Sequence, residues 1–208
     1  MLWAMELRKL AVTPRSTVRR RAQRGIYDRA LVDAILDEGM VCHVGLRRDE
    51  GTIVLPMAYG RIDDELFLHG ARSAALLQAM ADGIEACVCV TLLDALVLAK
   101  SAFHHSMNYR SVVLFGRARL LEAASEKLRA LTAIVEHKLP GRMSECRAPT
   151  SEELAATNVL AFPIQEGSAK VRTGGPIEDP ADEALEYWSG VVPISALSRG
   201  VTAARRLR

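Results

Sequence analysis

No apolar run in this 208-residue sequence approaches the roughly 20 residues that a helix needs to cross a bilayer. The first residues, MLWAMELRKL, lack the charged-then-apolar order and the small-residue cleavage site of a signal peptide. An excess of one charge is also missing, because 27 Lys and Arg nearly balance 25 Asp and Glu. The net charge of +2 gives no broad attraction for nucleic acid or an anionic membrane. We therefore expect a soluble, cytoplasmic protein with neither partner.

Cysteine is scarce, and its spacing shows neither a disulfide framework nor a CxxC metal-ligand pair. Cys87 and Cys89 share a face of an apolar stretch, where we expect them to pack as small hydrophobes. His104 and His105 are adjacent, so on an extended segment they point to opposite faces and cannot readily share one ion. The sequence predicts no metal site. The remaining cysteines are Cys42 and Cys146.

The nucleotide motifs GxGxxG and GxxxxGK[ST] do not occur, and there is no internal repeat or low-complexity segment. The length suits a single domain with decorated ends. We expect a basic arm over residues 1–27, the main domain over 28–198 and a loose tail over 199–208. The positive charge of the arm is concentrated in the stretch TPRSTVRRRAQRG. The arm is either solvated or reaches over a partner subunit or an anionic ligand.

Helices are expected at four points along the chain. Asp28 begins one that ends at Gly39, and Ser73 can cap a second that ends at Gly83. Residues 125–141 predict an amphipathic helix that Pro-Gly ends, and residues 176–188 predict an acidic turn into a short helix.

Strands are expected between these helices, and most are joined as hairpins. Three lie between residues 40 and 70, joined by the turns DEG and DD, and one over 84–103 is apolar enough to be buried on both faces. Further strands follow at 108–121 and 159–172, the latter a single strand or a pair. Six or so hairpin-connected strands favour a mainly β fold, a closed antiparallel barrel carrying helical additions.

One candidate ligand site is the strand-to-helix joint LFLHGARSAAL. Gly70 would let a ligand approach the backbone, Arg72 offers charge, and Ser73 stands at the helix start. His69 ends the strand there. It is equally explained as a hydrogen-bonded histidine at a strand end.

Two further clusters carry polar and aromatic side chains. In SMNYRSVVLFG, alternation puts Tyr109 and Ser111 on one face and Asn108 and Arg110 on the other. In SAKVR, Lys170 and Arg172 share a strand face and precede a late Trp188, which either fills core or interface or stacks on a ring. Two basic groups with an aromatic would suit a ring-bearing phosphate ester.

Six stretches, in family order, resemble the pyridoxamine 5'-phosphate oxidase-like FMN-binding split-barrel proteins. The similarity is strongest to the branch that includes the 5-nitroimidazole resistance, or nitroreductase-like, proteins. The stretches are TPRSTVRRRAQRGIYD, VLPMAYG, LFLHGARS, LLDALVLAKSAFHHSMNYRSVVLFG, ATNVLAFPIQEGSAKVRTG and YWSGVVPI. Together they cover nearly the whole chain.

The resemblance implies a six-stranded antiparallel split β-barrel that works as a homodimer, with one FMN in each of two clefts between the subunits. The segment from Pro56 through Met57 and Ala58 to Tyr59 would run along the flavin ring. His69, Gly70 and Ser73 would lie by the phosphate and the ribityl chain. The other cofactor-binding residues that it implies are Asn108, Tyr109, Arg110, Ser111, Lys170, Arg172 and Trp188.

The expected activity is transfer of electrons through FMN from a reduced nicotinamide, or another donor, to a small flat acceptor such as a nitro compound. His69 would be the catalytic residue, donating a proton to the reduced acceptor. Pyridoxamine 5'-phosphate oxidation itself is an alternative, but Ala74 and Ala75 stand where oxidases proper carry an Arg-Lys pair. A further alternative is a binding or sensing protein that holds flavin, or haem with His104 or His105 as its axial ligand.

Overall fold

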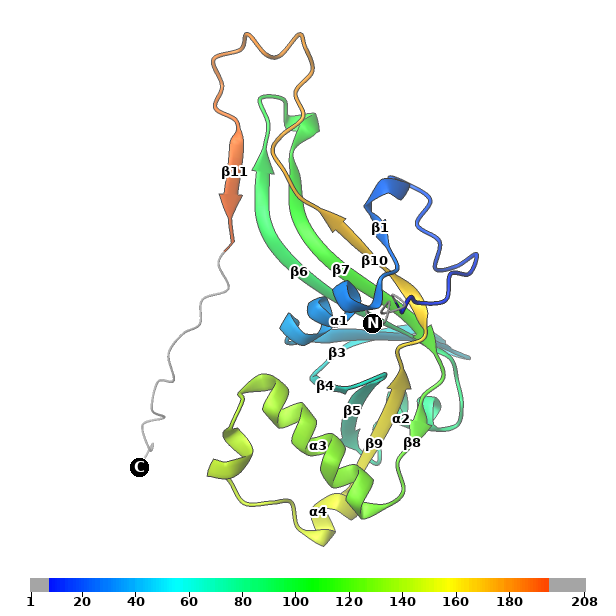
Figure 1. Ribbon diagram of the computed structural model, residues 1–208. Coiled ribbons are helices and arrows are strands. Elements are labelled where there is room, and N and C mark those ends of the chain that lie inside the picture. Colours follow the sequence, from blue (N-terminus) through cyan, green and yellow to red (C-terminus); the bar gives the residue numbers. More distant parts are fainter. Residues whose placement is uncertain (1–7, 195–208) are drawn as a thin grey trace, which may run out of the picture. The chain divides into compact units, whose positions relative to one another are not determined.

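The computed structural model describes residues 8–194 (Figure 1). Contacts between residues divide the chain into two compact units. Within the described residues, the first unit comprises 8–92 and 110–171, and the second comprises 93–109 and 172–194. The expected tail over 199–208 lies outside the described residues. No helix within residues 8–194 is both long enough and apolar enough to span a membrane.

The fold is mainly β, as predicted, but residues 8–194 contain eleven strands rather than six, arranged in two antiparallel sheets. The larger sheet has the order β1 (Gly25–Ile26), β10 (Glu166–Arg172), β7 (Ser106–Gly116), β6 (Ala86–Leu98), β2 (Cys42–Arg48) and β3 (Gly51–Met57), and β11 (Gly190–Pro193) also pairs with β6. The smaller sheet has the order β4 (Tyr59–Ile62), β5 (Glu65–Ala71), β9 (Thr157–Pro163) and β8 (Arg119–Leu120).

Three of the expected helices are present. In α1 (Arg29–Glu38) the Asp28 side chain accepts a hydrogen bond from the Leu31 amide, which confirms the predicted cap. The expected cap of α2 (Ala75–Ala81) is wrong, because Ala74 occupies that position and no side chain caps the helix. The third expected helix is α3 (Ala124–Lys138), and α4 (Ser151–Ala156) is a short addition. Single 3₁₀ turns lie at Ala22–Arg24, Ala102–His104 and Arg142–Glu145.

The three strands expected between residues 40 and 70 are in fact four. The turns DEG and DD join β2 to β3 and β4 to β5 as predicted, but the middle strand breaks at Ala58. On one side of this break the chain belongs to the larger sheet, and on the other to the smaller sheet. Periodicity does not reveal the change of sheet, because the residues on both sides of it have strand-like composition.

The main core lies in the first unit, between the two sheets. It joins Val44 and Val88 of the larger sheet to Leu68 and Phe162 of the smaller one. Apolar residues of α1 and α2, such as Ile35 and Met80, close it. A second cluster on the other face of the smaller sheet packs Phe67, Val159 and Ala161 against Ala130 and Ile134 of α3, which crosses β4, β5 and β9 (Figure 1).

Two other expectations are corrected. Strand β6 is not buried on both faces: its first part buries Ala86, Val88 and Val90, its second part buries Ala95 and Val97, and its other side chains, Cys87 and Cys89 among them, are half-buried or exposed. Residues 176–188 form turns and loop rather than a helix, because the Lys100 ammonium binds the carbonyl oxygens of Glu183 and Leu185 at 2.5 and 2.8 Å. These contacts come from a residue distant in sequence, and they stabilise a loop that local helix propensity does not predict.

The described part of the basic arm packs on its own chain. Leu10 is buried, and its amide donates to the Tyr27 carbonyl. Arg15 binds Glu85 at 2.7 Å and Glu166 at 2.5 Å, and its guanidinium lies 4.8 Å from the centre of the Phe115 ring. The charge of Arg15 is therefore neutralised within the chain.

Candidate functional site

The break at Ala58 brings two of the predicted site segments together. Tyr59, the first residue of β4, pairs with Leu68 of β5, and His69 is the next residue of β5 after Leu68. On the other side of β5, His69 pairs with Val159. The end of the segment expected to run along a flavin ring therefore lies next to the histidine expected near its acceptor, in one unit.

His69 is half-buried, and the environment of its ring is unusual. Its Nδ1 atom is buried and has no hydrogen-bond partner among the described residues. Burial lowers the pKa of the imidazole from its ordinary 6.5, so the ring is neutral at pH 7. A buried polar nitrogen without a partner costs about 1–3 kcal/mol, which a hydrogen-bonding ligand could recover.

The lowered pKa of His69 predicts a loss of stability in acid. The unfolded chain binds a proton to His69 at a higher pH than the folded chain does, so the free energy of unfolding falls as the pH drops from about 6.5 through the folded pKa. Urea denaturation between pH 7.5 and 5 checks this. His69→Gln cannot titrate and should flatten the profile, whereas an unchanged slope would show that His69 does not contribute.

The turn after β5 holds the other predicted residues of this segment. Ser73 is exposed, and Gly70 leaves room for a neighbouring side chain, since a Cβ there would lie 2.6 Å from Leu77 Cδ1. A cavity of about 430 Å³ opens beside the turn, lined in part by Arg72 and Asn158. The Arg72 guanidinium makes no hydrogen bond or ion pair within residues 8–194, so it is available to an anion.

Asn158 was missed by the sequence reasoning, although it stands opposite Gly70 in the pairing of β5 with β9. The signal that could have found it is a polar residue directly before the apolar run VLAF. Tyr59, by contrast, serves the core. Its side chain is fully buried, its hydroxyl donates to the Leu36 carbonyl, and its ring packs at a tilt against His137 with centroids 4.7 Å apart. Only its backbone can face a ligand.

A second group of predicted residues lies on β7 and β10 of the first unit. Arg110 binds the Glu38 carboxylate with both terminal nitrogens, at 2.5 and 2.8 Å. The Ser111 hydroxyl donates to the Lys170 carbonyl at 3.4 Å, and Lys170 pairs with Gly25. In the sheet order, β6 and β2 separate this group from Pro56 and Met57 on β3.

The remaining predicted residues belong to the second unit. Arg172 is buried, and it donates to the side-chain oxygen of Asn108 at 2.5 Å and to the Gly175 carbonyl at 3.2 Å. Asn108 in turn donates to the Gly174 carbonyl, so the pair holds the loop after β10. Tyr109 is half-buried, and Trp188 is 65% exposed. The second unit thus contains a loop held by buried polar groups and, further along the chain, an exposed indole.

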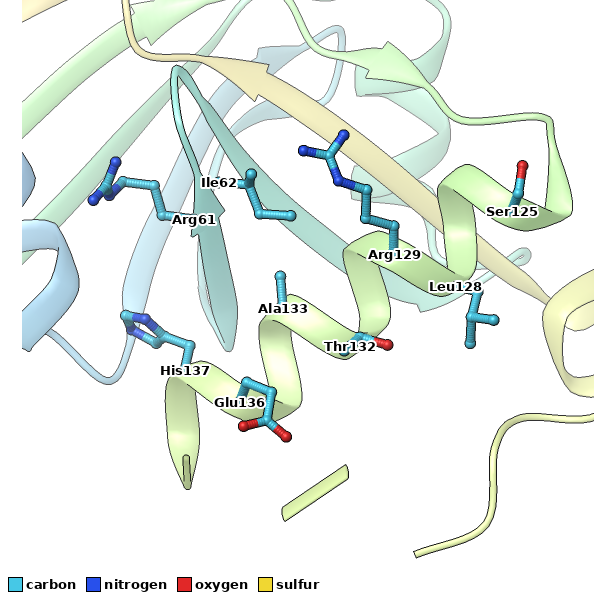
Figure 2. Close-up of a pocket in the computed structure, with 9 residues that line it drawn as sticks. All are labelled: Arg61, Ile62, Ser125, Leu128, Arg129, Thr132, Ala133, Glu136 and His137. Carbon is cyan, nitrogen blue, oxygen red and sulfur yellow. The ribbon is translucent and has the colours of Figure 1, made fainter. Parts of the chain in front are cut away.

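Two larger cavities open on the first unit. One, of about 490 Å³, lies on the outer face of β2, β3 and β6. The other, of about 580 Å³, is a groove along α3, with Arg61 and His137 toward one end and Ser125 and Leu128 toward the other (Figure 2).

The charged groups of the α3 groove are engaged by the protein itself. Arg61 binds Asp37 at 2.6 Å, and the Glu136 carboxylate accepts from the amides of Gly141 and Met143. No predicted site residue lines this groove. Within residues 8–194, no cluster of three or more His, Cys, Asp or Glu side chains has an arrangement that could hold a metal ion.

Comparison with known proteins places this geometry in a family. Among solved structures, the flavocytochrome Anf3 from Azotobacter vinelandii is 35% identical, with a TM-score of 0.87 over 93% of this chain and 90% of that one. An FAD- and haem-binding protein from Mycobacterium smegmatis is 36% identical, with a TM-score of 0.78 over 89% and 94%.

A candidate 5-nitroimidazole antibiotic resistance protein from Bacteroides thetaiotaomicron, 21% identical over 82% and 90% of the two chains, shares the fold with a TM-score of 0.58. No curated protein sequence matches significantly. Residues 28–171 match the family model described as pyridoxamine 5'-phosphate oxidase, so most of the chain is covered. The chain therefore belongs to the pyridoxamine 5'-phosphate oxidase family.

Proposed function

We propose that this protein is a flavoprotein that holds FMN and passes electrons from a reduced nicotinamide, or another donor, to a small flat acceptor such as a nitro compound. The observation that carries the proposal is the pairing of β4 with β5, whose last pair, Tyr59 and Leu68, brings the end of the Pro56–Tyr59 segment next to His69, and the buried ring nitrogen of His69 has no partner among the described residues. The family membership and the two flavin-binding relatives at 35% and 36% identity support it. The expected split barrel is part of the same proposal.

The described residues fit a flavin. Backbone groups from Met57 to Tyr59 would bind its ring, while Ser73 and the unpaired Arg72 would hold its phosphate. When bound, the flavin supplies the electron chemistry, and the protein contributes position and exclusion of water. Because burial keeps the imidazole neutral, His69 would donate a hydrogen bond to the ligand more readily than a full proton.

The phosphate end of this proposal is testable by placing a negative charge at the turn. Ser73→Asp should raise the Kd for FMN about fivefold or more, because two like charges a few ångströms apart repel by about 1 kcal/mol or more. Ser125→Asp, at an equally exposed serine on α3, is the matched control and should bind FMN normally. Quenching of flavin fluorescence measures both. Equal affinities in the two variants would place the phosphate elsewhere.

We also propose the homodimer, with its flavin clefts between subunits. Strand β3 is an edge strand of the larger sheet and exposes Leu55, the kind of edge that pairs with another chain. Within one chain, three strand spacings, about 14 Å, separate β3 from Arg110 and Ser111 on β7. In a dimer, the β7 residues of a second copy would contact the cofactor that lies along β3 of the first. Sedimentation should give twice the 22.7 kDa chain mass. A flavin-saturated monomer at micromolar concentration would contradict the dimer.

A second candidate function adds haem, because both relatives named above hold haem as well as flavin. Haem iron takes an axial histidine, and His105 has a suitable arrangement: its Nδ1 lies 3.0 Å from the Ser101 carbonyl, which leaves Nε2 exposed. His104 Nε2 is instead 3.0 Å from Asp179. A Soret band after addition of haemin, lost in His105→Ala, would support this function. A flavin spectrum alone would leave the first function standing.

A further inference from the structure

The 490 Å³ cavity on the outer face of β2, β3 and β6 has a regular layout that the proposed function does not use. Alternate residues of β2 face it, namely His43, Gly45 and Arg47. The register sets Gly45 between Val54 on β3 and Cys87 on β6. Gly45 therefore lies at the centre of a face formed by three strands, and among the β2 residues on this face it is the one that has no side chain.

The missing side chain at Gly45 creates the floor of the cavity. A Cβ built there would have Val54 Cγ2 as its nearest neighbour at 3.4 Å, followed by the carbonyl oxygens of Ile53 at 3.7 Å and Cys87 at 3.9 Å, so it would meet no close contact. Glycine within a strand weakens it and often marks a place where a ligand approaches the backbone closely. The walls around this floor are mostly apolar, with Leu46, Phe115 and the two half-buried thiols among them. A flat ring suits such a floor.

The charge at the rim of this cavity is positive. Arg15 contributes no net charge, because Glu85 and Glu166 bind it on both sides. Arg47 is different, since its guanidinium makes no hydrogen bond or ion pair within residues 8–194. An unpaired guanidinium beside an apolar floor recognises a carboxylate through two parallel hydrogen bonds.

We propose that this cavity binds a small aromatic carboxylate, with the ring over Gly45 and the carboxylate on Arg47. This inference rests on the proposed function, because it names the substrate class of the flavin site. Strand β3 links this cavity to the proposed flavin site. Its residues Thr52 and Val54 line the cavity, and Pro56 lies on the same face of the strand two residues after Val54. Pro56 is the first residue of the segment expected along the flavin. Its 490 Å³ lies within the range of small-molecule sites.

The test compares two probes of the same shape, 4-nitrobenzoate and the uncharged 4-nitrobenzamide, by calorimetry on the protein as purified. The wild type should bind the carboxylate about tenfold more tightly than the amide. In Arg47→Gln the two affinities should become equal through a loss on the carboxylate alone. Arg48→Gln is the matched control, because Arg48 pairs with Glu50 at 3.2 Å and does not line this cavity, and it should keep the full preference. Gly45→Leu should remove binding of both probes.

The outcomes separate this inference from the proposed function, since binding is measured independently of the flavin absorbance. A preference lost in Arg47→Gln and kept in Arg48→Gln supports the site whether or not flavin is present. If the protein is loaded with flavin and Arg47→Gln binds both probes as the wild type does, the inference is overturned and the flavin proposal stands. Undiminished binding in a Gly45→Leu variant with a native circular dichroism spectrum would also overturn it.

Discussion

Arg29→Met should lower the free energy of unfolding by about 3 kcal/mol, because it removes several hydrogen bonds of a charged group, each worth about 1.5–3 kcal/mol. Arg29 is 5% exposed, and its guanidinium binds Asp33 at 2.8 Å. It also donates to the carbonyl oxygens of Ile164 at 2.9 Å and Asp63 at 3.0 Å. Arg29 thus ties the start of α1 to the end of β9 and to the β4–β5 turn. Urea denaturation followed by circular dichroism measures the loss.

Arg8→Met is the matched control for Arg29. The two arginines share Asp64 as a partner, but the Arg8 side chain is 67% exposed. Exposed pairs gain little because water screens them. We expect the denaturation midpoint of Arg8→Met to stay close to that of the wild type. If the two variants lost equal stability, burial would not be the reason for the importance of Arg29.

Gly60→Ala should destabilise the protein by about 3 kcal/mol, since overpacking a rigid contact has a cost of this order. A methyl group at Gly60 would lie 2.6 Å from the carbonyl carbon and oxygen of Ala133 and from the Ile134 nitrogen. These are backbone atoms of α3, so no rotamer change relieves the clash, and α3 would have to move away from β4. Thermal unfolding of the variant measures the effect.

Gly45→Ala provides the comparison for Gly60 within another strand of the same unit. Its nearest contact would be a side-chain methyl at 3.4 Å, an ordinary packing distance. We expect the free energy of unfolding to change by no more than about 0.5 kcal/mol. If Gly45→Ala lost as much unfolding free energy as Gly60→Ala, the added methyl group would weaken strands generally. The contact between Gly60 and α3 would then not be the cause of the effect at Gly60.

Local sequence signals predicted the structure correctly where a single residue or a short turn determines it. Asp28 caps α1 because its side chain reaches an amide three residues on, and the turns DEG and DD close hairpins as their composition predicts. The local signals gave wrong predictions where contacts between residues distant in sequence determine the structure. The helix expected over 176–188 is replaced by loop because Lys100, far away in sequence, binds carbonyls there. Ser73 does not cap α2, because the turn extends one residue further.

The candidate site was predictable as a set of segments but not as an arrangement. The sequence indicated both His69 and the Pro56–Tyr59 segment, yet their adjacency depends on the change of sheet at Ala58. The interaction between Arg172 and Asn108 was not predicted, because 64 residues separate two polar groups that meet in a buried position. The cavity over Gly45 was missed for a similar reason: it exists only once three strands are in register.

The most direct test of the central claim is an absorbance and fluorescence spectrum of the freshly purified protein, followed by anaerobic addition of reduced nicotinamide. The account predicts two broad flavin bands with green fluorescence, and their bleaching by the reductant or by another donor. Any Soret band would appear in addition to these bands. A colourless protein that takes up neither FMN nor FAD would contradict the account.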